Sequence, residues 1–148
     1  MSPETRTLVH RTSLANAAIA VALSPLPLLD ELVLAPVLGV LGARIARRHQ
    51  LARRDIPWRP MLRATAVGLA ARFGLDVAVA IPVASAALSA TTAAALTELL
   101  GEYYDAACRD PAHVPALHVR EIASRIRQRV ASRTGQRTAP AGAGIREG

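Results

Sequence analysis

The side chains best suited to metal binding or covalent catalysis are four histidines and one cysteine. None of them shows the spacing that metal ligands require. The chain also lacks a phosphate-binding P-loop and a Gly-x-Gly-x-x-Gly motif, so its sequence indicates no nucleotide site. The residues concerned are His10, His49, His113, His118 and Cys108. The sequence therefore predicts a protein that is not an enzyme and that holds no metal or cofactor.

A pair of neighbouring acids interrupts the longest apolar stretch. Asp30 and Glu31 are the only charged residues within residues 14–43. Adjacent residues on a helix point about 100° apart, so these carboxylates are not expected to share a catalytic site. The first turn of a helix favours negative charge, and Pro25 and Pro27 precede the pair. We expect a proline turn followed by a helix that Asp30 helps to cap.

The apolar pattern is helical throughout. The chain is 51% hydrophobic but only 3% aromatic, and no alternating run of β-branched residues is sustained, which argues against a sheet. The predicted helices cover residues 13–23, 28–50, 61–80, 83–107 and 116–133, with a kink or a restart at Pro36. The expected organisation is a polar lead at 1–11, a helical-hairpin domain at 12–110, a hinge and basic amphipathic helix at 111–133, and a disordered tail at 134–148.

The two halves of the helical region resemble each other. Pro27 and Pro82 lie 55 positions apart, and the same shift places the apolar run 32–43 on 87–98. Each half is a short apolar helix, a proline turn and a longer apolar helix. The predicted fold is therefore all-α, with two pseudo-repeated, proline-tipped apolar hairpins and a basic C-terminal amphipathic helix.

Small residues repeat along the second predicted helix. Ala35, Gly39 and Ala43 fall on one face with the small-xxx-small spacing that allows close helix contact. This face predicts helix packing, including self-association into a homo-oligomer.

The chain has a net charge of +7, and its positive charges are all supplied by arginine because it contains no lysine. This charge implies attraction to the phosphates of lipid or nucleic acid. The arginines gather in two places, which we expect to form a surface for lipid or a partner. The first holds Arg44, Arg47, Arg48, Arg53 and Arg54 beside Trp58, and the second holds Arg120, Arg125, Arg127 and Arg129.

The C-terminal arginines flank an apolar stripe. Val119, Ile122, Ala123, Ile126 and Val130 recur at helical spacing. Such a helix lies on an anionic membrane or a partner, or packs within its own domain. Nucleic-acid binding is the least favoured alternative, because base-stacking aromatic residues are missing here.

The bases of the two predicted hairpins carry opposite charges, for which two interpretations remain open. They are two solvated helix ends, or they form a salt-bridge seam between the hairpins. The acids are Glu98, Glu102 and Asp105, and the bases are Arg44, Arg47 and Arg48.

Two stretches are similar to a known family. They are "NAAIAVALSPLPLLDELVLAPVLGVLGARIAR" at residues 16–47 and "AALTELLGEYYDAA" at residues 94–107. Over about residues 13–107 the chain resembles the domain of unknown function family 697. The resemblance implies a helical, membrane-associated domain that is fused to, or encoded beside, dynamin-like or Era-like GTPases. It assigns no catalytic residues, and it implies a separate GTPase chain as a partner.

Charge placement supports the membrane hypothesis, because every basic segment falls on the same side of both hairpins. We therefore expect a non-enzymatic bacterial accessory protein whose hairpins insert into the inner membrane, with its termini and Arg-rich loop on the cytoplasmic side. The alternatives are a soluble basic helical module that binds protein or nucleic acid, and a small oligomeric membrane pore.

Overall fold

The computed structural model describes residues 1–23, 27–78, 85–114 and 116–137, and all regular structure within them is helical. The elements are α1 (Pro3–Leu23), α2 (Pro27–Arg48), α3 (Trp58–Ala78), α4 (Ser85–Arg109), a 3₁₀ turn η1 (Pro111–His113) and α5 (Val119–Arg137). The predicted all-α class is confirmed.

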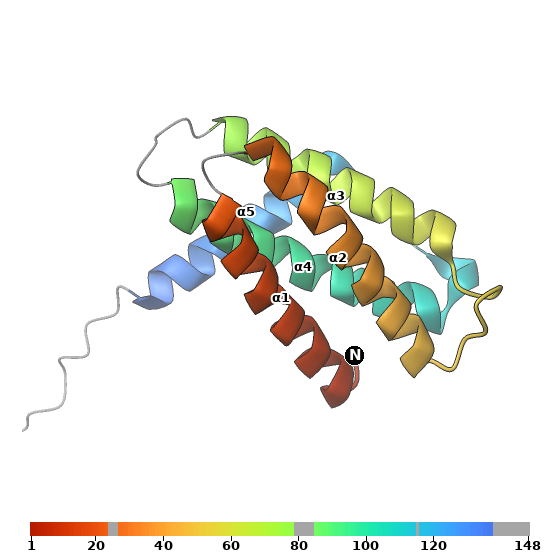
Figure 1. Cartoon of the computed structure of the whole chain (residues 1–148). Coiled ribbons are helices and arrows are strands. Elements are labelled where there is room, and N and C mark those ends of the chain that lie inside the picture. Colours follow the sequence, from red (N-terminus) through yellow and green to blue (C-terminus); the bar gives the residue numbers. More distant parts are fainter. Residues whose placement is uncertain (24–26, 79–84, 115, 138–148) are drawn as a thin grey trace, which may run out of the picture.

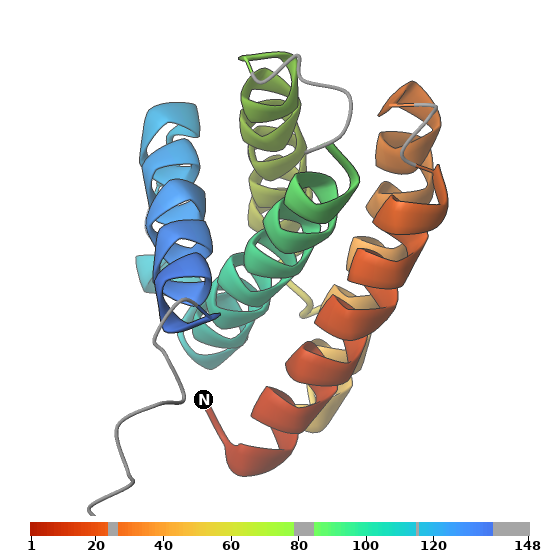
Figure 2. The ribbon, with the colours of Figure 1, turned by 90° about the vertical axis from the view of Figure 1, so that its left-hand side faces the viewer.

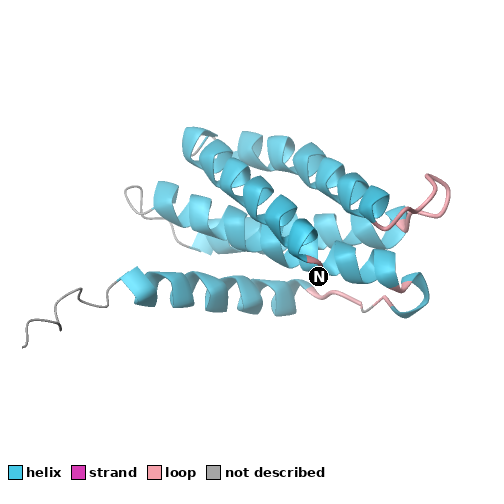
Figure 3. Cartoon of the chain, turned by 90° about the horizontal axis from the view of Figure 1, so that it is seen from below, coloured by secondary structure: helices cyan, strands magenta, loops and turns pink. Residues whose placement is uncertain are grey.

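Helix α4 is the central element of the fold. It packs against α1, α2, α3 and α5, and α1 has its most extensive contact with α4 rather than with α2. Figure 1 shows the order of the helices along the chain. Helices α1 and α2 lie on one side of α4, while α5 lies on the other and contacts only α3 and α4 among the described helices (Figures 2 and 3). Two hairpins that are separate in sequence therefore share one core.

Aliphatic side chains from all five helices fill this core. The buried residues include Val9 of α1, Leu41 and Ile45 of α2, Met61 and Ala64 of α3, Leu96 and Leu100 of α4, and Ile122 and Ile126 of α5, and the aromatic ring of Tyr104 joins them. Glycine brings the helices close at two points. A Cβ on Gly101 would lie 2.6 Å from Val9, and one on Gly68 would lie 2.8 Å from Leu96. These two glycines allow α1 and α3 to approach the central helix.

Helix α1 begins much earlier than the sequence analysis predicted. The Ser2 hydroxyl accepts a hydrogen bond from the backbone N–H of Thr5 at 3.2 Å, so Ser2 caps the helix. Pro3 then opens α1 and Glu4 lies in its first turn. The predicted polar lead at 1–11 is thus mostly helix. Serine, proline and an acid in succession were the pattern that could have revealed this start.

Prolines interrupt the helices less than expected. Helix α2 continues through Pro36, so of the predicted kink or restart the restart does not occur. Helix α3 begins at Trp58 and holds Pro60 in its first turn, where a missing N–H costs little. Pro27 opens α2, as a first-turn proline can. The predicted turn residues Pro25 and Pro82 lie outside the described residues, as does the side chain of Asp30.

The membrane hypothesis is wrong. Among the described residues, no helix combines the length and the apolar character needed to cross a bilayer. The expected hairpin insertion and inner-membrane location therefore have no basis in the fold, and the pore alternative loses its support with them. The apolar faces instead contact one another: Leu34 and Leu38 of α2 and Ala20 of α1 are buried.

The C-terminal region is more helical than expected. The predicted hinge contains η1, where the Asp110 carboxylate accepts a hydrogen bond from the backbone N–H of Ala112. Helix α5 reaches Arg137 and so includes the first residues of the predicted tail. The remainder of that tail, 138–148, lies outside the described residues.

Candidate binding surface around the turn between α2 and α3

The turn after α2 is fixed by a specific C-terminal cap. The N–H of Gln50 donates to the carbonyl of Arg47, and the N–H of Leu51 donates to the carbonyl of Ala46. This pair of bonds is a Schellman motif, in which the residue that follows the helix end must adopt a left-handed backbone conformation. Gln50 has that conformation, with φ 57°. The cap places Leu51 against the core and aims the following residues back across the end of α2.

A pocket of about 360 Å³ opens where this turn meets the start of α3. We call it the turn pocket. Its lining combines aliphatic walls, two guanidinium groups and the only tryptophan of the chain. Trp58 is half-buried and both arginines are exposed. The lining residues are Ala43, Arg47, Leu51, Arg53, Ile56 and Trp58.

The charge of the turn pocket is not balanced locally. No acidic residue lines it, and neither Arg47 nor Arg53 forms an ion pair within the described part of the chain. The neighbouring Arg48 and Arg54 differ, because their guanidinium groups lie 3.8 Å from the carboxylates of Glu4 and Asp55 respectively. Such long, exposed pairs are worth little. The structure therefore brings three of the sequence-predicted residues, Arg47, Arg53 and Trp58, into one pocket.

The small-residue face of α2 makes little contact inside the molecule. A Cβ placed on Gly39 would meet nothing within 4 Å. Ala35 and Ala43 are partly exposed, and Ala43 lines the turn pocket. Within the molecule, close helix packing occurs at Gly68 and Gly101, while self-association through the Ala35, Gly39 and Ala43 face stays a prediction.

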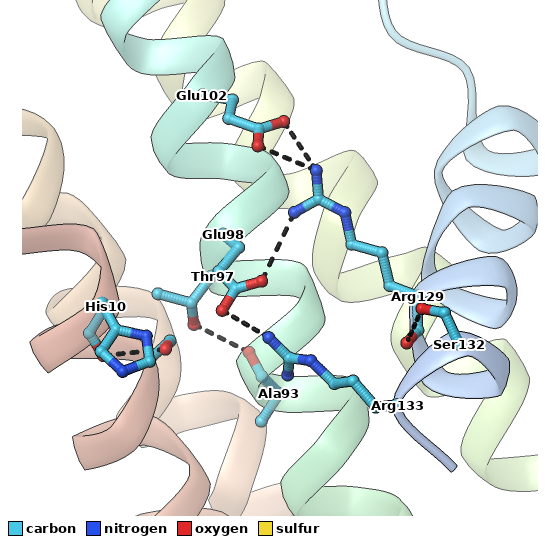
Figure 4. Close-up of polar contacts among 9 residues, drawn as sticks. His10, Ala93, Thr97, Glu98, Glu102, Arg129, Ser132 and Arg133 are labelled. Atoms are coloured by element: carbon cyan, nitrogen blue, oxygen red, sulfur yellow. Dashed lines mark hydrogen bonds and ion pairs between the residues drawn. The ribbon is translucent and has the colours of Figure 1, made fainter. Parts of the chain in front are cut away.

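The C-terminal arginines have acidic neighbours from within the chain. Arg129 donates to both carboxylate oxygens of Glu102, at 2.9 and 2.7 Å, and lies 3.6 Å from Glu98. Arg133 donates to Glu98 at 2.5 Å. Figure 4 shows these contacts bridging α4 and α5, with His10 of α1 on the opposite side of α4. The charges join α5 to the body of the fold.

The other arginines of α5 form weaker local contacts or none. Arg125 donates to Glu121 one turn earlier at 2.8 Å, and the Nε of Arg127 donates to the carbonyl of Ala123 at 3.4 Å. Arg120 is exposed and forms no ion pair among the described residues. Since Ile122 and Ile126 are buried beneath them, the apolar stripe faces the core of its own domain. Of the alternatives for this helix, packing within the domain describes it.

Salt bridges do join the helices, chiefly α4 to α5, and Asp105 of α4 also meets His49, which directly follows α2. Glu98 and Glu102 pair with α5, and Asp105 pairs with Arg109 at 2.6 Å and with His49 at 3.0 Å. Among the described residues, none of the three acids contacts the basic end of α2 formed by Arg44, Arg47 and Arg48. The sequence correctly found the charges but not their partners.

Hydrogen bonds between polar side chains also connect the helices at their buried interfaces. The Asn16 side-chain amide donates to the Thr97 hydroxyl at 2.8 Å, which joins α1 to α4. Arg72, wholly buried in α3, donates to the Ser89 hydroxyl at 2.7 Å. The sequence analysis did not identify these contacts. A buried polar group favours the arrangement in which it is hydrogen-bonded, so these contacts help to fix how the helices are aligned, although the Asn16 side-chain oxygen has no partner among the described residues.

Burial raises the pKa of two groups in the core. The pKa of Tyr104 rises to about 12, chiefly through burial. The Thr65 hydroxyl donates to the carbonyl of Met61, which leaves the Tyr104 hydroxyl to donate to Thr65 at 2.5 Å. The pKa of the Cys108 thiol rises to about 11 through burial and the nearby Asp105. A thiol held protonated is a poor nucleophile.

The described part of the chain contains no cluster of His, Cys, Asp or Glu that could hold a metal ion. What the arrangement offers is a concave, partly apolar surface with uncompensated positive charge. Comparisons with protein-family models, curated proteins and solved structures return no match.

Proposed function

We propose that this protein is a non-enzymatic helical interaction module that binds an acidic segment of a partner protein in the turn pocket. One observation carries the proposal: Arg47 and Arg53 flank Trp58 in a pocket that no acidic residue lines. Tryptophan and arginine are the residues that most often dominate the energy of protein interfaces.

The pocket suits a ligand with both charge and apolar surface. Leu51 and Ile56 form aliphatic walls beside Trp58, and these can cover an apolar side chain. The two guanidinium groups present planar donors that match a carboxylate. An acidic peptide carrying an apolar residue satisfies both parts of the lining.

A protein partner fits better than nucleic acid for two reasons. Trp58 is the only tryptophan, so the surface offers no row of aromatic residues on which successive bases could stack. The arginines of α5 do not extend the basic surface towards the pocket, because α5 lies on the other side of α4. The GTPase implied by the family resemblance is one candidate partner, provided that it carries an acidic segment.

The test uses Trp58 as its own reporter. The full chain is titrated with a synthetic Glu-rich peptide that contains a central leucine and no tryptophan, while Trp58 emission is recorded. We expect a saturable change in emission that weakens as salt is raised, because exposed charges are screened over about 10 Å at 0.1 M ionic strength. The double variant Arg47→Ala/Arg53→Ala should bind about tenfold more weakly or worse, equivalent to about 1.4 kcal/mol.

Arg120→Ala is the matched control, because Arg120 is also exposed and free of ion pairs but lies on α5. It should bind the peptide as the unmodified chain does. The proposal is wrong if both variants bind equally well, or if a Lys-rich peptide binds as tightly as the Glu-rich one. A DNA duplex that binds more tightly, with the same dependence on Arg47 and Arg53, would establish the nucleic-acid alternative instead.

A further inference from the structure

A second concave surface lies along α2, nearer the N-terminus of that helix than the turn pocket. A groove of about 480 Å³ runs between α1 and α2, and we call it the α1–α2 groove. Leu8 and Ala15 line it from α1, and Val37, Val40 and Leu41 line it from α2. Its surface is therefore mainly aliphatic.

The apolar surface continues along α2 beyond the groove. Val40 is 52% exposed, and Val33, seven residues earlier on the same face of the helix, is 38% exposed. Two large aliphatic side chains spaced by two helical turns are the pattern with which a helix meets a neighbouring helix. In the described structure no such neighbour lies against Val40.

Both helices that form the groove contribute a positive charge to it. Arg11 comes from α1 and Arg44 from α2, and both are exposed. Neither forms an ion pair within the described residues, and no acidic residue lines the groove. An occupant with carboxylates along its edges would gain from both arginines.

We propose that the α1–α2 groove binds an amphipathic helix of a partner protein, with acidic residues flanking its apolar stripe. A groove between two helices accommodates a third helix, whose apolar residues at i, i+3, i+4 and i+7 enter it. The inference rests on the proposed function in taking the partner to be acidic. It adds a helical contact on a surface that does not include Trp58.

A second copy of this chain is a poorer occupant. Each copy has a net charge of +7, so docking would bring arginine-rich surfaces together. The carboxylates of Glu98, Glu102 and Asp105 already pair within the chain and are not free to neutralise Arg11 or Arg44. Charge complementarity therefore favours a different, acidic protein.

The test uses a fluorescein-labelled synthetic helix of about 18 residues, roughly 27 Å long, with a leucine stripe flanked by glutamates. Binding to the full chain is followed by fluorescence anisotropy. Val40→Asp should weaken binding about tenfold or more, since it places a carboxylate in the groove. Val119→Asp is the matched control, because Val119 is 45% exposed but lies on α5, and it should leave the affinity within about twofold.

Arg44→Glu is a second variant that tests the charge at an exposed position, and it should also weaken binding. Helix content by circular dichroism is measured for every variant, so that loss of fold is recognised. The inference is overturned if Val40→Asp and Val119→Asp have the same effect, or if a helix with lysines in place of glutamates binds equally well. It is also overturned if sedimentation reveals a dimer that Val40→Asp abolishes, because the groove would then hold a second copy.

The experiments test the turn pocket and the α1–α2 groove independently of each other. Binding of the helical probe that persists in Arg47→Ala/Arg53→Ala supports the groove even if the turn pocket binds nothing. Conversely, loss of the acidic-peptide signal from Trp58 only in the Arg47 and Arg53 variants supports the turn pocket, whatever happens at Val40.

Discussion

The two arginine-rich regions look alike in sequence and differ in structure. On α5, Arg129 and Arg133 pair with Glu98 and Glu102, and the helix is joined to α4. At the end of α2 and in the following turn, Arg47 and Arg53 lie beside Trp58 with no ion pair among the described residues. The first set of charges is therefore used to hold the fold together, and the second is available to a partner.

This difference follows from which helices are neighbours. Helix α5 lies against α4, whose outer face carries the acids, whereas the turn after α2 lies against the start of α3, which carries Arg59 and no acid in its first turn. Exposure alone would not separate the regions, since Arg120 and Arg53 are both exposed. What separates them is the surroundings: Arg129 and Arg133 meet carboxylates of α4, whereas Arg47 and Arg53 line a pocket with Trp58 and no acidic residue.

The largest expected effect tests whether α5 belongs to the core. Ile126 is fully buried between α5 and its neighbours, so Ile126→Ala should lower the free energy of unfolding by about 2–4 kcal/mol. Val119→Ala, at an exposed position on the same helix, should change it by about 0.5 kcal/mol or less. Urea unfolding followed by circular dichroism measures both. Equal, small effects would mean that α5 is not packed on the fold.

Alkaline pH should weaken the fold without discharging either arginine region. The folded-state pKa of Tyr104 is about 12 and that of Cys108 is about 11, both above their usual values of 10.0 and 9.0. The protonated forms are thus favoured by folding, and their contribution is complete below about pH 9 and lost as pH rises through 11 to 12. Arginine stays charged in this range, and the chain contains no lysine.

The measurement is the free energy of unfolding at pH 8 and pH 11. We expect a fall on the order of 2 kcal/mol from these buried groups together. Tyr104→Phe should cost about 1 kcal/mol at pH 8, because the hydrogen bond to Thr65 is lost, yet it should show a smaller further fall at pH 11. An equal fall in both proteins would show that Tyr104 does not control the alkaline transition.

Replacing the arginines should separate stability from binding. Arg129→Ala/Arg133→Ala should destabilise the fold by about 1 kcal/mol, since an exposed pair with Glu102 and a partly buried pair with Glu98 are lost. Arg47→Ala/Arg53→Ala should change stability by about 0.5 kcal/mol or less, because those side chains have no ion pair to lose. Thermal and urea unfolding compare the two variants. Similar losses in both would remove the distinction drawn between the two regions.

A charge swap provides the control for the α4–α5 contact. Arg129→Glu alone places three carboxylates together and should be worse than Arg129→Ala, whereas Glu102→Arg/Arg129→Glu should recover part of the loss. Stability is recovered only if the side chains at positions 102 and 129 contact each other. If the double variant is no more stable than Arg129→Glu, these charges act only through the overall electrostatic field of the protein.

The sequence located most helices because their boundaries depend on local chemistry. The predicted helix at 28–50 corresponds to α2 (Pro27–Arg48), and that at 83–107 corresponds to α4 (Ser85–Arg109). Prolines and the apolar period mark both. The start of α1 was missed because the cap at Ser2 lies far from the apolar stretch that attracted attention.

The candidate site was predicted only in part, because charge partners depend on tertiary contacts. Arg47, Arg53 and Trp58 were named as a surface, and the cap at Gln50 brings them together over a short stretch of chain. The pairing of Glu102 with Arg129 spans 27 positions and depends on where α5 lies. An amphipathic basic helix has the same sequence pattern whether its apolar face contacts a membrane or the core of its own domain. The membrane hypothesis rested on the apolar hairpins, and it failed because no described helix is long and apolar enough to cross a bilayer.

The smallest expected effect concerns the turn that shapes the binding pocket. Gln50 adopts a left-handed conformation with φ 57°, which costs a residue with a Cβ about 1 kcal/mol. Gln50→Gly should therefore stabilise the fold by about 0.5–1 kcal/mol, and Gln50→Ala should not. Because the Schellman bonds to Arg47 and Ala46 are backbone bonds, neither variant should alter peptide binding at Trp58. Stabilisation together with weaker binding would instead mean that the Gln50 side chain itself contacts the ligand.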